Sequence, residues 1–230
     1  NTFISSLSFL ALVVLLSIFI IQMKKHQEIL GIKLALLFGI VSILMIHYVY
    51  LLEMNIEIVH AFAYGGLIFL FFAFFKRWAA AVIFSIPIML IDEWNQYINL
   101  YPTYVEYWEL NDVVLDILGE IFVLIFLFSM NIKSNNSKVK WFKKSEFIFG
   151  LSLICFFSIL TLTGIFAIHQ SQARDYTQFV MSRLQNYNVS WHVHGLTKKV
   201  YYIMNPKEAM GIIVVFCITL FYLDSTLAKE

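Results

Sequence analysis

This chain is poor in charged side chains, proline and cysteine. Of its 230 residues only 13% are charged, three are proline and two are cysteine, whereas 60% are hydrophobic. So little polar surface cannot cover one water-soluble core, which excludes an ordinary soluble domain. Both cysteines, Cys155 and Cys217, fall inside apolar stretches. Free buried thiols are therefore expected, and a disulfide framework is not.

Motifs of familiar soluble enzymes are missing as well. The sequence shows no Ser, His and Asp triad, no nucleotide-binding loop and no Cys-rich zinc pattern. No nucleic acid partner is expected.

Seven long apolar stretches fill most of the chain and predict an all-α, polytopic transmembrane helix bundle. A spanning helix needs roughly 20 mostly apolar residues, and continuous apolar runs differ from the short alternating strands of a barrel. The predicted spans are 3–22, 34–52, 56–75, 78–98, 112–130, 147–168 and 208–223. The first span is expected to be a retained helix, because its positive residues follow the apolar run.

Basic residues occur at every second junction between the spans and predict the orientation. Lys and Arg near span ends favour the cytoplasmic side. They are Lys24, Lys25, Lys33, Lys76, Arg77, Lys133, Lys138, Lys140, Lys143 and Lys144. This pattern places the N-terminus outside, the C-terminus inside and one outer loop of about 40 residues between the last two spans. The chain divides into an extra N-terminal span with a basic loop (1–33), a four-helix membrane core (34–130) and a C-terminal part with two further spans (131–230).

Acidic residues gather in the middle of the chain without bases nearby. Nine of the fifteen lie between Glu53 and Glu120, and no Lys or Arg occurs from Trp78 to Ile132. One acid near the bilayer centre costs about 3 kcal/mol on insertion scales and usually faces a bundle interior or a water-filled cavity. Several acids together therefore predict a polar cavity near the outer leaflet.

Helical spacing brings these acids to similar predicted depth on three consecutive antiparallel helices. Asp112, Asp116 and Glu120 follow one another at intervals of four and share one stripe of the fifth span. Polar pairs on the third and fourth spans are also four residues apart. The candidate cavity residues are Glu57, His60, Tyr64, Asp92, Glu93, Gln96, Asp112, Asp116 and Glu120.

Two readings of this cavity stay open. In the first, the side chains only satisfy one another through interhelical hydrogen bonds. In the second, the cavity accepts a cationic, hydroxyl-rich or lipid-linked group from the outer leaflet. Histidine with several carboxylates also suits a divalent cation or acid and base chemistry on a lipid-linked substrate.

Three runs of sequence carry these residues: "IEIVHAFAYGGL", "DEWNQYINLYP" and "NDVVLDILGE". In their order and spacing, over about residues 35 to 130, the chain resembles the VanZ-like family of bacterial membrane proteins. By this resemblance the recurrent family positions are Glu57, His60, Tyr64, Glu93, Gln96, Asp112 and Gly119. Two departures stand out. Asp116 replaces the usual Asn, and the Arg that normally follows the proline-containing turn is absent.

The resemblance implies a multi-pass protein of the bacterial cytoplasmic membrane. Some members of the family confer reduced susceptibility to teicoplanin and related lipoglycopeptides. A membrane lipid or a lipid-linked envelope precursor is then the expected partner, with a bound lipid or a divalent cation as possible cofactor. Family membership does not by itself make the chain an enzyme. With 23 Phe and 12 Tyr, the chain also fits an accessory subunit packed against other membrane proteins.

The outer loop from His169 to Glu208 is net basic. Its first half has apolar residues at helical spacing from Ala173 to Tyr187, which predicts a short amphipathic helix. The run "VSWHVHGLTKKVYYI" predicts a strand or hairpin, with His192 and His194 as surface histidines. We expect the loop to cover the acidic cavity and to supply the missing counter-charge. The residues of this counter-charge lid are Arg174, Arg183, Lys198 and Lys199.

Overall fold

The computed structural model of this chain describes residues 30–96, 110–130, 141–168, 172–177 and 190–226. It also describes residues 10, 13–14, 17–18, 21, 132, 134–135 and 179–180. Most of the expected first span, 3–22, lies outside the described residues.

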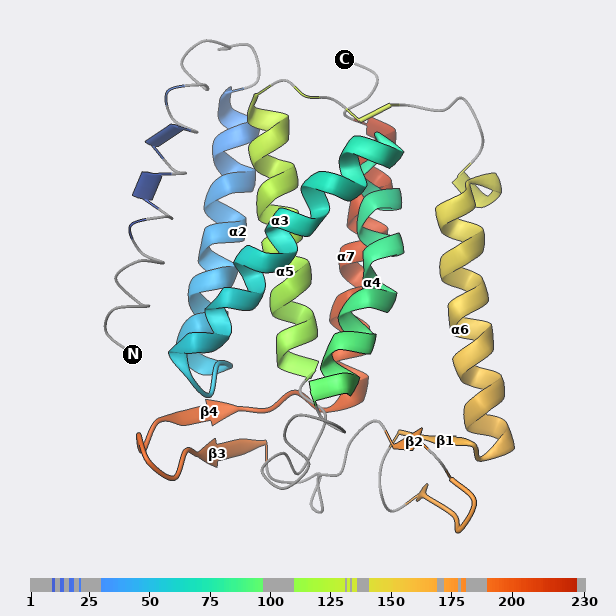
Figure 1. The fold of residues 1–230 in the computed structure, drawn as a ribbon. Coiled ribbons are helices and arrows are strands. Elements are labelled where there is room, and N and C mark those ends of the chain that lie inside the picture. Colours follow the sequence, from blue (N-terminus) through green and yellow to red (C-terminus); the bar gives the residue numbers. More distant parts are fainter. Residues whose placement is uncertain are drawn as a thin grey trace.

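The described helices form an antiparallel bundle around one central helix. They are α2 (Leu30–Tyr50), α3 (Ile58–Phe75), α4 (Trp78–Asn95), α5 (Leu110–Ser129), α6 (Ser145–Thr163) and α7 (Pro206–Thr226). Helix α5 contacts α2, α3, α4 and α7, whereas α6 stands at the edge of the bundle against α4 (Figure 1). Each of the six expected spans after the first overlaps one of these helices, although the expected span 147–168 runs past the end of α6 at Thr163.

Four of the described helical segments are long and apolar enough to cross a membrane. They are Gly31–Tyr50, Asn55–Phe75, Ser145–Thr163 and Pro206–Asp224. Helices α4 and α5 fall outside this set. Almost every side chain of α5 is buried, so its surface is covered by neighbouring helices and can carry polar residues. The long apolar helices are those of a membrane protein.

Glycine brings α3 and α5 into close contact. A Cβ atom on Gly119 would overlap the backbone of Ala61, and one on Gly65 would lie 3.1 Å from Val123 Cγ2 and 3.4 Å from the carbonyl oxygen of Gly119. Gly65 and Gly119 therefore allow α3 and α5 to approach closely, whereas a Cβ on Gly66 would meet nothing within 4 Å. This contact sets the depth at which the polar residues of the two helices meet.

Short strands lie at the lower end of the bundle in Figure 1, beyond the α2–α3 turn. Strands β3 (Trp191–Val193) and β4 (Val200–Tyr202) form an antiparallel hairpin in which Trp191 pairs with Tyr202. This confirms the predicted strand or hairpin. The described part of the chain is mostly helical, as the all-α prediction requires, and its strands are only two or three residues long.

The prediction of an amphipathic helix from Ala173 onward is wrong for the residues that the structure describes there, 173–177 and 179–180. Arg174 and Thr177 close a turn through a backbone hydrogen bond of 2.9 Å. The Thr177 hydroxyl also accepts from the Arg174 amide and donates to the carbonyl of Gly164. Strand β2 (Phe179–Val180) then pairs in parallel with β1 (Phe166–Ala167). The threonine hydroxyl offers the backbone bonds that compete with a helix.

Helix α7 begins with a reciprocal cap. The Asn205 side-chain oxygen accepts from the amides of Lys207 and Glu208, both at 3.0 Å, and the Asn205 amide donates to the Glu208 carboxylate, also at 3.0 Å. Together with Pro206 in the first turn, this arrangement explains why the helix begins where it does.

Candidate functional site

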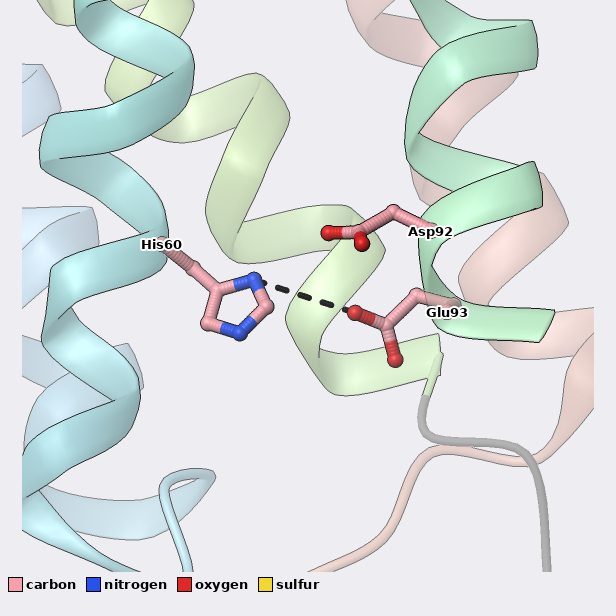
Figure 2. Close-up of side chains that lie close together, drawn as sticks. All are labelled: His60, Asp92 and Glu93. Atoms are coloured by element: carbon pink, nitrogen blue, oxygen red, sulfur yellow. Dashed lines mark ion pairs between the residues drawn. The ribbon is translucent and has the colours of Figure 1, made fainter. Parts of the chain in front are cut away.

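Three helices each bring a polar side chain to one point inside the bundle. His60 of α3 places its Nδ1 atom 3.4 Å from Asp116 Oδ1 of α5 and 3.7 Å from Glu93 Oε1 of α4. Figure 2 shows the imidazole ring facing both Glu93 and its neighbour Asp92. Asp116 is fully buried and Glu93 is 3% exposed. Together, His60, Asp92, Glu93 and Asp116 are called the acidic cluster below.

Two neighbouring side chains hold the carboxylates of α4 in place. The Tyr64 hydroxyl donates to Asp92 Oδ2 at 3.1 Å. Gln96 Nε2 donates to the same oxygen at 3.4 Å and to Glu93 Oε1 at 3.3 Å. Both carboxylates are therefore oriented by uncharged donors, and their negative charge is not neutralised by these bonds.

Several buried polar atoms around the cluster have no hydrogen-bond partner among the described residues. They are His60 Nδ1, both carboxylate oxygens of Asp116, Asp112 Oδ1 and Glu120 Oε1. Buried polar groups in folded proteins are nearly always hydrogen-bonded, and exceptions need an explanation such as a function or an additional ligand. The interhelical hydrogen bonds therefore do not satisfy the whole set of acids.

The three acids of α5 form a column along the helix. Asp112, one turn before Asp116 in the sequence of α5, interacts electrostatically with Glu57, His60 and Asp116. Glu120, one turn deeper than Asp116, accepts a hydrogen bond of 2.8 Å from the Ser85 hydroxyl. All three acids are buried, so the stripe expected from their spacing faces the bundle interior.

Glu57 has a local structural role. Its carboxylate accepts hydrogen bonds from the amides of Glu53, at 2.9 Å, and Met54, at 2.6 Å. These bonds close the turn that precedes α3, where the 3-10 segment η2 spans Asn55–Glu57. Glu57 also lies close enough to Asp112 to interact with it electrostatically.

An open groove lies beside the cluster and has a volume of about 510 Å³. Its walls come from α3 and α4, and most of its lining side chains are apolar. The lining residues are Ala63, Tyr64, Leu67, Ile88, Ile91, Asp92 and Asn95. Because Tyr64 and Asp92 also belong to the polar network, the groove connects an apolar surface with the acidic cluster.

Of the described residues of the counter-charge lid, Lys198 and Lys199 are neighbours in the β3–β4 turn, whereas Arg174 lies in the turn before β2. Lys199 donates from Nζ to the carbonyl of Tyr48 at 3.2 Å, and Nζ lies 5.6 Å from the centre of that ring. Burial lowers the pKa of Lys199 below its ordinary value, and the nearby Glu57 carboxylate opposes this shift. Lys199 therefore supplies positive charge at Glu57, on the rim of the site.

The other three lid residues have different positions. Arg174 donates to the hydroxyl of Tyr176 and lies over that ring. Lys198 is exposed in the β3–β4 turn with a left-handed φ of 57°. Arg183 lies outside the described residues.

Two residues with clear roles at the site were not predicted. Ser85 lies seven residues before Asp92, which is two helical turns and thus the same face of α4, so its spacing was a usable signal. Asn111 donates to the carbonyls of Leu51 and Tyr202 and accepts from the amide of Met204. No local pattern predicts these bonds, because the partners of Asn111 come from distant parts of the chain.

In comparisons with protein-family models, with curated proteins and with solved structures, nothing matches this chain. The function of the site therefore has to be inferred from its own geometry and chemistry.

Proposed function

We propose that this chain is a VanZ-like, seven-span protein of the bacterial cytoplasmic membrane whose acidic cavity binds a lipid-linked component of the cell envelope. Through this binding it reduces susceptibility to teicoplanin and related lipoglycopeptides. The observation that carries the proposal is the group of buried, incompletely hydrogen-bonded acids beside an apolar groove.

The two parts of the site suit the two parts of a lipid-linked molecule. Hydroxyl or ammonium donors of a head group would satisfy the open carboxylate oxygens of Asp112 and Asp116. An acyl or prenyl chain would lie against Leu67, Ile88 and Ile91 in the groove. Ligand sites commonly combine mostly apolar walls with a few placed polar groups.

The distribution of basic residues supports the proposed orientation. At the end of the bundle opposite the β3–β4 hairpin, α2, α4 and α6 begin and α3 ends (Figure 1). Lys33, Lys76, Arg77 and Lys144 belong to these helix ends. By the positive-inside rule this end is cytoplasmic. The acidic cluster then lies nearer the outer leaflet, where lipid-linked envelope precursors are used, with the N-terminus outside and the C-terminus inside.

The proposal is tested by deleting the gene in its own host and measuring the minimal inhibitory concentration of teicoplanin. We expect susceptibility to rise at least about twofold and to return to the parental value with the unaltered gene. Complementation with Asp112→Asn or His60→Gln should fail at equal protein level, because each removes an ionisable group of the cavity.

His194→Gln serves as the matched control. His194 lies 3.7 Å from a single carboxylate, that of Glu53, and outside the acidic cluster. Complementation with this variant should be complete. An unchanged inhibitory concentration after deletion would refute the proposed resistance function.

A second candidate is an accessory subunit of a larger membrane complex, and helix α6 favours it. Large apolar side chains are exposed along the helix, including Ile148, Leu151, Ile154, Ile159 and Leu162. A stoichiometric membrane protein co-purified in mild detergent, and lost on replacement of Leu151 and Ile154 by Ser, would support this role. Purification as a single species would contradict it.

A further inference from the structure

We infer that the acidic cluster is a binding site for one divalent transition-metal ion, such as Zn²⁺ or Mn²⁺, held by His60, Asp92, Glu93 and Asp116. The inference rests on the proposed function, because the ion would lie where the cavity meets the groove. It adds a defined ligand to that cavity, with a test that needs neither lipid nor antibiotic.

The spacing of the donor atoms suits a metal ion. One ligand atom each from His60, Asp92 and Glu93 can be chosen so that all three lie within 4.8 Å of one another. Zinc bonds to nitrogen and carboxylate oxygen are about 2.0–2.2 Å long, so two ligands of a tetrahedral ion are roughly 3.4 Å apart. The separations of 3.7 Å from His60 to Glu93 and 3.4 Å from His60 to Asp116 are close to that value.

The environment of Asp116 gives an independent indication of a ligand. Its side chain is fully buried, and neither of its oxygens has a hydrogen-bond partner among the described residues. Its Oδ1 atom lies 3.4 Å from His60 Nδ1 and faces the cluster from α5. A buried carboxylate is costly unless a cation or a base compensates it, and the one base beside Asp116 among the described residues, His60, also faces Glu93. An ion between α3, α4 and α5 would provide that compensation.

Hydrogen bonds around the cluster resemble the outer shell of a metal site. Ligating carboxylates and histidines are usually oriented by further hydrogen bonds. Tyr64 and Gln96 both donate to Asp92, and Gln96 also donates to Glu93. These bonds hold the two α4 ligands in one orientation.

The donor set selects the class of metal. An imidazole nitrogen with carboxylate oxygens suits zinc or manganese, whereas calcium and magnesium prefer oxygen alone. Two positive charges would offset the three carboxylates of the cluster better than Lys199, which lies at Glu57. An octahedral Mn²⁺ held by these four residues would also accept a phosphate oxygen from a lipid-linked group in the adjoining groove.

The test measures metal binding to the purified full chain. The protein is stripped with a chelator in detergent, and Zn²⁺ or Mn²⁺ alone is then added. Calorimetry and elemental analysis should report one ion per chain, and bound Mn²⁺ should change its electron paramagnetic resonance spectrum. No retained ion above the detergent blank would overturn the inference.

Variants then locate the ion. Asp116→Asn and His60→Gln should each weaken binding at least about tenfold, and Tyr64→Phe should weaken it about tenfold through loss of the outer hydrogen bond. His194→Gln should bind like the parent. Should Asp116→Asn fail to fold, His60→Gln and Tyr64→Phe provide the same comparison. Parental affinity in the folded ligand variants would also overturn the site.

The outcomes separate this inference from the proposed function. A deletion that changes teicoplanin susceptibility, together with a protein that binds no ion, would overturn the metal site alone. A stoichiometric ion in a protein whose deletion leaves susceptibility unchanged would overturn the resistance function alone.

Discussion

At the end of the bundle where α3 meets α4, buried charges have opposite or dipolar partners, whereas at the other end the buried charges share one sign. Arg77 binds both oxygens of Glu146, at 2.9 and 2.8 Å. Asp224 accepts from the first amides of α4 at 3.1 and 2.8 Å. Lys33 donates to the carbonyl of Ser129, at the last residue of α5. Around His60, in contrast, the three carboxylates of Asp92, Glu93 and Asp116 face a single histidine.

This difference separates charges that stabilise the fold from charges that are compensated only when a ligand binds. A buried pair of opposite charges is complete within the protein, and a charge at a helix end is offset by the helix dipole. A buried surplus of one sign costs stability until something compensates it. The following predictions test that contrast, from the largest expected effect to the smallest.

Arg77→Ala should give the largest effect. It leaves the fully buried Glu146 without its counter-charge, which should lower the free energy of unfolding by about 3–5 kcal/mol. Unfolding of the purified protein in detergent, followed by circular dichroism, measures this change. Replacing Arg77 and Glu146 together by Met should restore most of the loss. A double variant as unstable as the single one would show that charge pairing is not the cause.

Gly119→Ala should disturb the contact that holds the acidic end together. The added methyl group would overlap the backbone of Ala61 and should cost roughly 1–3 kcal/mol, as overpacking does. Gly66→Ala is the matched control on α3, because its methyl group would meet nothing within 4 Å. Thermal unfolding of both variants in the same detergent makes the comparison. Equal midpoints would contradict the close contact between α3 and α5.

Asp116→Asn should change stability in the opposite direction to Arg77→Ala. Removing one charge from a surplus of like sign should raise the free energy of unfolding of the metal-free protein by roughly 0.5–2 kcal/mol, as trade-offs at functional sites commonly do. Unfolding in the presence of chelator measures it. A clear loss of stability would mean that Asp116 is paired and belongs with the structural charges.

Asp224→Asn should produce a moderate loss at the charge-paired end. The amide oxygen can still accept one hydrogen bond, but the charge that offsets the positive end of α4 is gone. We expect a loss of about 1 kcal/mol, measured by the same unfolding assay. Glu208→Gln, at the exposed start of α7, should preserve its hydrogen-bond acceptor and change stability less. The reverse order would contradict the role given to Asp224.

Lys199 should give the smallest effect, visible in alkaline solution. Burial lowers its pKa below 10.5 in the folded state, with Glu57 opposing the shift. The unfolded chain then binds more protons just below pH 10.5, so stability should rise slightly as the pH approaches that value. Lys199→Met should remove this rise. An identical pH dependence of thermal unfolding in both proteins would show that the burial of Lys199 has no measurable cost.

Much of the helical framework could be predicted because it depends on local patterns. Apolar runs predict helices at the positions of α2 to α7, and glycine at positions 65 and 119 indicates close helix contact. The spacing of four residues places Asp112 and Asp116 on one buried face. The meeting of His60 with Glu93 and Asp116 follows from equal depth on antiparallel helices.

The long-range partners could not be predicted, because nothing local encodes them. Asn111 donates to the carbonyls of Leu51 and Tyr202, which are 60 and 91 residues away in sequence. Arg77 and Glu146 are 69 residues apart in sequence. Pairing of β1 with β2 likewise depends on where α6 ends. Such contacts depend on the assembled bundle.

The bond between Asp224 and α4 has a consequence for biosynthesis. The amide of Trp78 is separated from its acceptor by 146 residues, and a chain is synthesised from its N-terminus at roughly 5–20 residues per second. For many seconds, until the last helix has been made and inserted, the amides of Trp78 and Ala79 therefore lack the acceptor that Asp224 provides. The bundle is completed only when α7 docks, so a ribosome that stalls or terminates before Asp224 releases an unfinished protein that quality-control proteases can recognise.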